Sequence, residues 1–261
     1  MQQATPRELG FRRDRAVVLG GIIGVAALAW AYILYLAWDM NSMVGENMVM
    51  AQMRPWGATD FILTFIMWAV MMTAMMVPSA APMLLLFTDV QLRRKAQQRP
   101  FVPTGVFLLG YLVVWCGFAA VASVAQWGLH TAALLSPLMA STSPFLGGSL
   151  LVAAGVFQWT PLKSICLSRC RSPLNLLMTE WRDGIKGTFV MGLRHGIFCL
   201  GCCWVLMALL FVLGVMNLLW IAALAGFVLI EKLAPTSQLV GRLTGVLLVA
   251  WGSWMILRAL G

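Results

Sequence analysis

The sequence predicts an all-α fold, a polytopic bundle of about seven transmembrane helices, and three observations support this. Hydrophobic residues make up 61% of the chain and charged residues only 10%, whereas a soluble globular domain carries about 25% charged residues. The mean hydropathy is +0.87, so the chain cannot cover itself with a wettable surface. Its apolar runs are continuous, as in membrane-spanning helices of about 20 residues, and a transmembrane barrel would show short alternating segments instead.

Seven apolar segments are the expected spans. They cover residues 16–37, 61–87, 103–127, 145–162, 188–213, 217–233 and 239–259. The second carries Pro78 and Pro82, which predict a kink or a break because proline removes a backbone donor and clashes with the preceding turn. The fourth is short and glycine-rich, and the fifth and sixth are so close that they predict a tight helical hairpin. The loops are too short to bury cores of their own, so residues 1–261 are expected to form a single transmembrane domain.

Lysine and arginine predict the orientation. Of the 18 basic residues, 16 fall in the N-terminal tail and in loops on the same side of the predicted spans, and only Arg54 and Arg258 fall on the other side. The positive-inside rule then places the N-terminus in the cytoplasm and the C-terminus across the membrane. The net charge of +9 is explained by this topology and by attraction to anionic lipid, and nucleic acid is not an expected partner. The first span is too long for a typical signal peptide and is expected to be retained.

The motifs of common enzyme classes are absent. The chain has no phosphate-binding glycine loop, no HExxH and no GxSxG. None of its nine acidic residues lies near the centre of a span, where an ion-coupled transporter would usually carry a carboxylate. Glu231 and Lys232, at the inner end of the sixth span, are expected to pair with each other or with loop charges. The sequence therefore favours a protein that is not an enzyme.

The fifth span carries the densest group of metal-ligating side chains, in HGIFCLGCCW. On a helix that turns 100° per residue, His195, Cys199 and Cys202 project within an arc of about 60°, with Cys203 at its edge. Thiolate, thioether and imidazole ligands that converge in this way suit Cu(I) best and Zn(II) next. The alternative is that the cysteines are small hydrophobic residues that pack between helices.

The second span supplies methionines at the same expected depth. Met71 and Met75 lie on one stripe of the predicted helix, and Met72 and Met76 lie on a second stripe beside it. Counted from the two faces of the membrane, these thioethers and the cysteines of the fifth span both fall near the midplane. The two sulfur groups could therefore face each other, unless the methionines only fill gaps in the bundle.

Two further sulfur groups lie in predicted loops on opposite sides of the membrane. The outer loop carries methionines throughout residues 40–53, which predicts either capture of Cu(I) or an amphipathic segment on the bilayer. The inner loop carries Cys166 and Cys170 beside basic residues, which favour the thiolate form and so metal transfer or redox chemistry. Outer loop, midplane and inner pair would then form a path. Cys116 and His130 are expected to be structural.

Three segments give the chain a family resemblance, namely MWAVMMTAMMVPSAAPM, WTPLKSICLSRCRSP and GLRHGIFCLGCCWVLMALLFVLGVMNLLWIAALAGFVLIEKLAP. From about Arg54 to Pro235 it resembles a bacterial family of predicted metal-binding integral membrane proteins, some of which are described as copper chaperones. The resemblance implies the inner membrane as location. It also implies ten candidate ligands, Met71, Met72, Met75, Met76, Cys166, Cys170, His195, Cys199, Cys202 and Cys203.

The expected function is therefore to bind Cu(I), the suspected cofactor, with zinc as the second choice, and to transport it or deliver it for the assembly of cuproenzymes. The expected partners are membrane lipid and a copper donor or cuproenzyme. Two alternatives stay open. The chain could be an accessory subunit or assembly factor of a larger membrane complex, with sulfurs as filler, or a thiol-redox protein that uses Cys199 with Cys202 or Cys166 with Cys170.

Overall fold

In a computed structural model, which describes residues 6–42, 56–132, 134, 143–234 and 237–260, the protein is all-helical over the described part. The helices, in chain order, are α1 (Pro6–Ser42), α3 (Ala58–Ala96), α4 (Thr104–Thr131), α5 (Pro144–Phe157), α6 (Pro161–Arg171), α7 (Pro173–Thr179), α8 (Gly184–Ala208), α9 (Leu210–Leu213), α10 (Leu218–Leu233) and α11 (Ser237–Leu260). The all-α prediction is thus confirmed over these residues.

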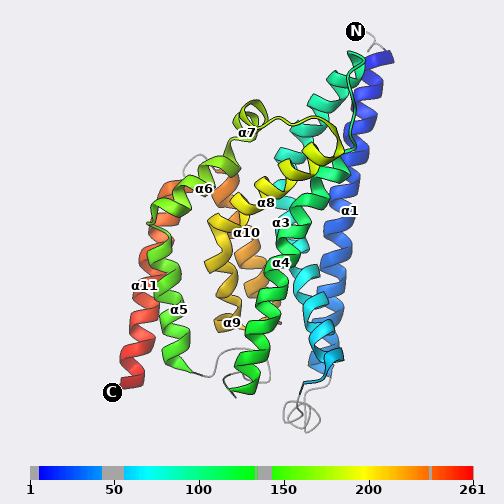
Figure 1. The fold of residues 1–261 in the computed structure, drawn as a ribbon. Coiled ribbons are helices and arrows are strands. Elements are labelled where there is room, and N and C mark those ends of the chain that lie inside the picture. The colour runs from blue at the N-terminus through cyan, green and yellow to red at the C-terminus, as the bar shows by residue number, and fades with distance from the viewer. Residues whose placement is uncertain (1–5, 43–55, 133, 135–142, 235–236, 261) are drawn as a thin grey trace, which may run out of the picture.

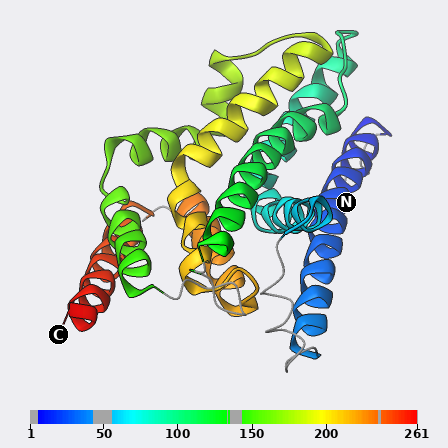
Figure 2. The same cartoon turned by 60° about the horizontal axis from the view of Figure 1, so that its bottom comes forward.

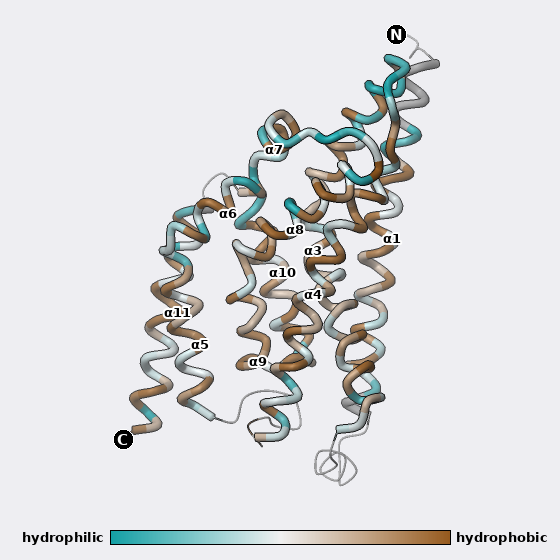
Figure 3. The backbone as a smooth tube through the Cα atoms, viewed as in Figure 1, coloured by the Kyte–Doolittle hydropathy of each residue, from teal (hydrophilic) through white to brown (hydrophobic). Residues whose placement is uncertain are grey.

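The helices run back and forth between two ends of the molecule (Figure 1). The chain alternates in direction through α1, α3, α4 and α5, turns through α6 and α7 at the end that holds the N-terminus, and returns through α8 and α9. Helix α10 brings it back once more and α11 carries it to the opposite end, where the C-terminus lies. Polar residues gather at the N-terminal end, around α7 and the loops beside it (Figure 3).

Five helical stretches are long and apolar enough to cross a membrane. They lie in α1, α3, α4, α8 with α9, and α11, and a sixth span results if the bent pair of α5 and α6 is taken as one. Helix α10 has 16 residues and reaches about 24 Å, short of the roughly 30 Å of the hydrocarbon core. By length, the described residues therefore support five or six spans where seven were predicted, although each predicted segment is helical.

The fourth predicted span, 145–162, is wrong at its inner end. Helix α5 ends at Phe157, and α6 sets off at 63° from it. Pro161 occupies the first turn of α6, and the Thr160 hydroxyl accepts a hydrogen bond from the amide of Lys163 at 3.3 Å. A residue that precedes proline avoids the helical conformation, and threonine caps the new helix, so the chain turns here.

Helix α3 runs without interruption through Pro78 and Pro82, so of the predicted kink or break the break is wrong, and the kink stays a prediction. Proline is tolerated within membrane helices where neighbouring helices and hydroxyl side chains satisfy the disturbed backbone. Beside the two prolines, the carbonyl oxygen of Met76 accepts hydrogen bonds from the Ser79 hydroxyl at 2.8 Å and from the Tyr111 hydroxyl of α4 at 3.1 Å, while the carbonyls that lose their helical donor are those of Ala74 and Pro78. The second of these bonds ties α3 to α4 beside the prolines.

Helices α4 and α8 pack closely because glycines lie between them. A Cβ on Gly192 would lie 2.1 Å from the carbonyl oxygen of Phe107, and a Cβ on Gly110 would lie 2.3 Å from that of Phe189. Small residues of this kind let the backbones of membrane helices approach each other. The next two turns of α8 therefore lie against Tyr111, the residue after Gly110. The His195 ring packs on the Tyr111 ring, and Cys199 Sγ lies at its hydroxyl.

Helices α5 and α11 form a pair at the edge of the molecule, beside the bundle of the other long helices (Figures 1 and 2). The core lies in that bundle, where the buried methionines of α3 and the buried cysteines of α8 belong to one hydrophobic cluster.

Candidate metal centre

Three cysteine thiols of α8 form the centre of the candidate site. Cys199, Cys202 and Cys203 are all buried, with exposed fractions of 0%, 2% and 0%. The sulfurs of Cys202 and Cys203 each lie 3.0 Å from the carbonyl oxygen of Cys199 and donate to it. The three thiols are therefore gathered around one turn of the helix, and Cys203, expected at the edge of the arc, is as deeply buried as the other two.

A lysine from α10 and a tyrosine from α4 reach the same sulfur. The Lys232 Nζ atom lies 2.9 Å from Cys199 Sγ and donates to the Ser79 hydroxyl at 2.7 Å. The Tyr111 hydroxyl lies 3.0 Å from Cys199 Sγ on another side. Lys232 is only 8% exposed, so a basic side chain is held inside the bundle against the thiol that the sequence singles out.

These contacts bring α3 and α8 to the same level. One atom, Lys232 Nζ, bridges Ser79 and Cys199, and the Tyr111 hydroxyl bridges the Met76 carbonyl and Cys199. Met76 and Ser79 of α3 therefore lie at the level of Cys199 along the bundle, and the midplane depth of the two sulfur groups stays a prediction. The four predicted methionines are buried in α3 just before this point, namely Met71, Met72, Met75 and Met76.

His195 lies one turn before Cys199 on the same helix, and its side chain is buried. Its imidazole packs among aromatic rings, with centroids 5.9 Å from Phe107 and 5.6 Å from Tyr111. Neutral imidazole is a ligand for copper and for zinc. Its place on the face that carries Cys199 matches the arc predicted from the helical period.

The cysteines of α6 lie against α8 and do not form a separate inner site. The Cys170 thiol lies close enough to the Cys202 thiol to interact with it, and Cys166 Sγ would lie 2.7 Å from a Cβ placed on Gly201. The inner pair and the α8 thiols are therefore neighbours, and the predicted path from the outer loop to the inner pair stays a prediction. Cys170 is half-buried, which gives this cluster its most accessible thiol.

The other sulfur and histidine predictions have less structural support. The outer methionines at residues 43–53 and the side chain of Met40 lie outside the described residues. Cys116 is exposed on α4, and the His130 ring lies 5.0 Å from that of Trp56. Both are away from the α8 thiols, in line with the structural role expected for them.

The donor set suits a soft ion. Within the described parts of the chain, no three side chains of the His, Cys, Asp and Glu types are placed so that they could hold a metal ion. Thioethers are the remaining sulfur donors, and the buried methionines of α3 belong to the same hydrophobic cluster as the α8 cysteines. Sulfur and imidazole donors without a carboxylate favour Cu(I) over harder ions. The ligand assignment stays a prediction.

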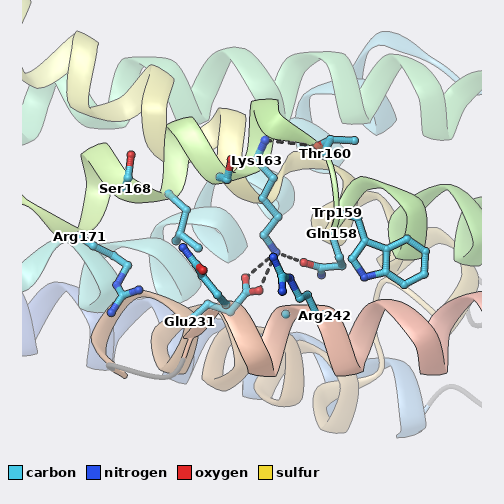
Figure 4. Close-up of a pocket in the computed structure, with 12 residues that line it drawn as sticks. Gln158, Trp159, Thr160, Lys163, Ser168, Arg171, Glu231 and Arg242 are labelled. Atoms are coloured by element: carbon cyan, nitrogen blue, oxygen red, sulfur yellow. Dashed lines mark hydrogen bonds and ion pairs between the residues drawn. The ribbon is translucent and has the colours of Figure 1, made fainter.

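A second group of buried charges lies beside the thiols, where α6, α10 and the end of α5 meet (Figure 4). The Lys163 ammonium donates to both carboxylate oxygens of Glu231, at 2.6 and 2.8 Å, and to the side-chain oxygen of Gln158. The prediction that Glu231 pairs with a charge from the inner loop is confirmed, and the alternative pairing of Glu231 with Lys232 is not formed.

Three residues of the contact network around Cys199 were not among the candidate site residues of the sequence, namely Ser79, Tyr111 and Lys232. Lys232 carries the clearest signal, since it is a basic residue in the last turn of an apolar helix and membrane segments rarely hold such charges without a role. Tyr111 and Ser79 carry no such signal, because their positions follow from how α3 and α4 pack.

Comparison with known families gives one result for this arrangement. The model of the PpoB2 family, described as copper chaperone, matches residues 65–255. That range includes all ten candidate ligands as well as Ser79, Tyr111 and Lys232. Neither the curated proteins nor the solved structures contain a match.

Proposed function

Because the chain belongs to the PpoB2 copper chaperone family, we propose that it binds Cu(I) between α3, α4, α8 and α10 and passes the ion to a partner at the membrane. The observation that supports this proposal is that Tyr111 and Lys232 each join Cys199 Sγ to the part of α3 that follows the buried methionines, at the Met76 carbonyl and the Ser79 hydroxyl. The family description indicates binding and delivery of copper, which is a role without catalysis. Long apolar helices support a multi-pass membrane protein.

In this proposal Cys199 and Cys202 are the principal ligands. They are buried on the face of α8 that also carries His195, and one turn of helix separates each from the next. The buried methionines of α3 supply thioethers that complete the coordination. Cys203 supports the two thiols from within the same turn.

Charge balance gives Lys232 a role in the site. Two thiolates and one Cu(I) ion carry a net charge of −1, and an uncompensated charge in the membrane interior is costly. The Lys232 ammonium, 2.9 Å from Cys199 Sγ, would neutralise that charge. The lysine therefore serves as a built-in counter-ion that makes a two-thiolate copper site tolerable in this surrounding.

Ion transfer would start at the contact between α6 and α8. The Cys170 thiol is a neighbour of the Cys202 thiol, so a Cu(I) ion would pass from one thiolate to the other. Cys170 is the more accessible of the two, and it offers the ion to a partner, either a copper donor or a cuproenzyme under assembly. By the distribution of basic residues this exit faces the cytoplasm of a bacterial inner membrane.

The test is the copper content of the purified protein. Wild-type protein loaded with Cu(I) is expected to retain it in stoichiometric amount after desalting, and the variant Cys199→Ser/Cys202→Ser/Cys203→Ser is expected to retain at most about a tenth of that. Cys116→Ser is the matched control, because that thiol is exposed on α4. Stoichiometric copper in the triple variant, or retention of Zn(II) in place of Cu(I), would overturn the proposal.

A further inference from the structure

A polar cavity of about 380 Å³ opens beside the metal centre, between α6, α10 and α11 (Figure 4). It is lined by side chains that the copper proposal does not use. Those that matter here are Gln158, Lys163, Arg171, Glu231 and Arg242.

The charges of this cavity leave it basic. The only carboxylate in its lining belongs to Glu231, and both oxygens of that group accept from the buried Lys163. Arg242 adds a positive charge from α11, and among the described residues no carboxylate pairs with it. Arg171 contributes a second guanidinium, which donates to the Ala234 carbonyl at 2.7 Å. The neutral pair of Lys163 with Glu231 and the positive charge of Arg242 therefore face the cavity.

A buried amide in the lining lacks an acceptor. Gln158 is 8% exposed, and its side-chain oxygen accepts from Lys163. Its Nε2 atom is buried without a hydrogen-bond partner, and an unmade bond of this kind usually costs about 1–3 kcal/mol. Because buried donors in native proteins are nearly always satisfied, the amide marks a place for an acceptor that comes from outside the chain.

We propose that this cavity binds an oxyanion of the phosphate class, which accepts from the Gln158 amide and pairs with Arg242. A cation does not fit, since the one carboxylate is already neutralised by Lys163. Guanidinium groups match the geometry of phosphate oxygens, and basic pockets between membrane helices on the cytoplasmic side are places where phospholipid headgroups bind. This inference is independent of the copper role.

The position of the cavity gives the anion two sources. Trp159, in the lining and 46% exposed, is a residue type that sits at the boundary of membrane and water, so a lipid phosphodiester can reach the space from the bilayer. Free phosphate can reach it from the aqueous side. Both sources present the same oxygens to the same donors.

The test uses Arg242→Gln, with Arg258→Gln as the matched control on the far end of the same helix. In one arm, protein purified in mild detergent is mixed with phosphatidylglycerol or phosphatidylcholine, and retained lipid is counted by native mass spectrometry. In the other arm, lipid-free protein is titrated with inorganic phosphate in a calorimeter. Binding in either arm is expected to weaken about tenfold in Arg242→Gln and to be unchanged in Arg258→Gln.

The outcomes identify the source of the anion and decide whether the cavity binds an oxyanion at all. Retention of phosphatidylglycerol that depends on Arg242 identifies a lipid ligand, and phosphate binding that depends on Arg242 without lipid retention identifies a soluble one. Gln158→Leu adds a readout without a change of net charge and is expected to weaken the same arm in folded protein, as judged by its elution as a monodisperse species. If neither arm depends on Arg242, the cavity is not an oxyanion site.

Discussion

At the scale of single residues, Lys232 has the most unusual surroundings in the described structure. Its ammonium lies inside a helix bundle and contacts a hydroxyl and a sulfur, at 2.7 and 2.9 Å. The adjacent residue, Glu231, points the other way and pairs with Lys163. Burying an ion without a charged partner is unfavourable, so the copper-free protein bears a cost at Lys232 that the bound state would relieve.

The variant Lys232→Met tests whether the buried lysine destabilises the copper-free protein and stabilises the copper complex. Without copper, the variant is expected to be more stable by up to about several kcal/mol, the effective penalty for taking one ion out of water, because a hydrophobic side chain of similar volume replaces it. Its affinity for Cu(I) is expected to fall about tenfold or more, because the two-thiolate complex loses its counter-ion. Thermal unfolding in detergent and competition with a colorimetric Cu(I) chelator measure the two effects.

Two further variants serve as controls for Lys232→Met. Lys186→Met makes the same substitution at an exposed lysine in the first turns of α8 and should change neither quantity. Lys232→Arg keeps the positive charge and should recover part of the affinity. Unchanged copper affinity in Lys232→Met would show that the ammonium is not the counter-ion of the site.

At the scale of the helices, the site depends on how closely α4 approaches α8. The two backbones touch at Gly110 and Gly192, which leaves the Tyr111 hydroxyl 3.0 Å from Cys199 Sγ. A wider spacing would remove that contact and move α4 away from the thiols.

The variant Gly192→Ala should therefore disturb both fold and site. Its Cβ would lie 2.1 Å from the carbonyl oxygen of Phe107, a backbone atom that can move only with its helix. Overpacking of this kind costs about 1–3 kcal/mol, and weaker Cu(I) binding should accompany it. Gly117→Ala is the control on α4, since nothing lies within 4 Å of that Cβ. Denaturation in detergent should separate the two variants, and equal stabilities would contradict the close approach.

The helical period and the hydropathy of the sequence were enough to predict much of the arrangement of the helices. The continuous helix α8, which sets the arc of His195, Cys199 and Cys202, follows from the helical period and is confirmed. The midplane depth of the two sulfur groups stays a prediction. The turn after Phe157 was missed because its signal, Thr160 before Pro161, lies inside an apolar run. The contact between Cys170 and Cys202 could not be predicted, since it depends on the angle at which α6 leaves α5.

At the scale of the whole molecule, the direction in which each successive helix runs decides the membrane topology more than the length of the helix does. The N- and C-termini lie at opposite ends of the bundle (Figure 1), and the polar residues gather at the N-terminal end (Figure 3). Helix α10 is too short for a standard span, yet it must bring the chain from the end of α9 back to the start of α11. A short helix can cross where the bilayer thins or its flanking residues reach the interface.

Alkaline phosphatase inserted at three places tests whether α10 crosses the membrane. The enzyme is active only outside the cytoplasm, so a fusion after Asn217 should be active, one after Ala234 inactive and one after Leu260 active. The reason is that α10 and α11 then run in opposite directions between the two faces, and Lys232 and Arg242 lie on the basic, cytoplasmic side. Fluorescent protein fusions at the same positions should give the complementary pattern and control for expression. Activity at both Asn217 and Ala234 would mean that α10 turns back within the membrane, which would place the cavity beside Glu231 on the outer face.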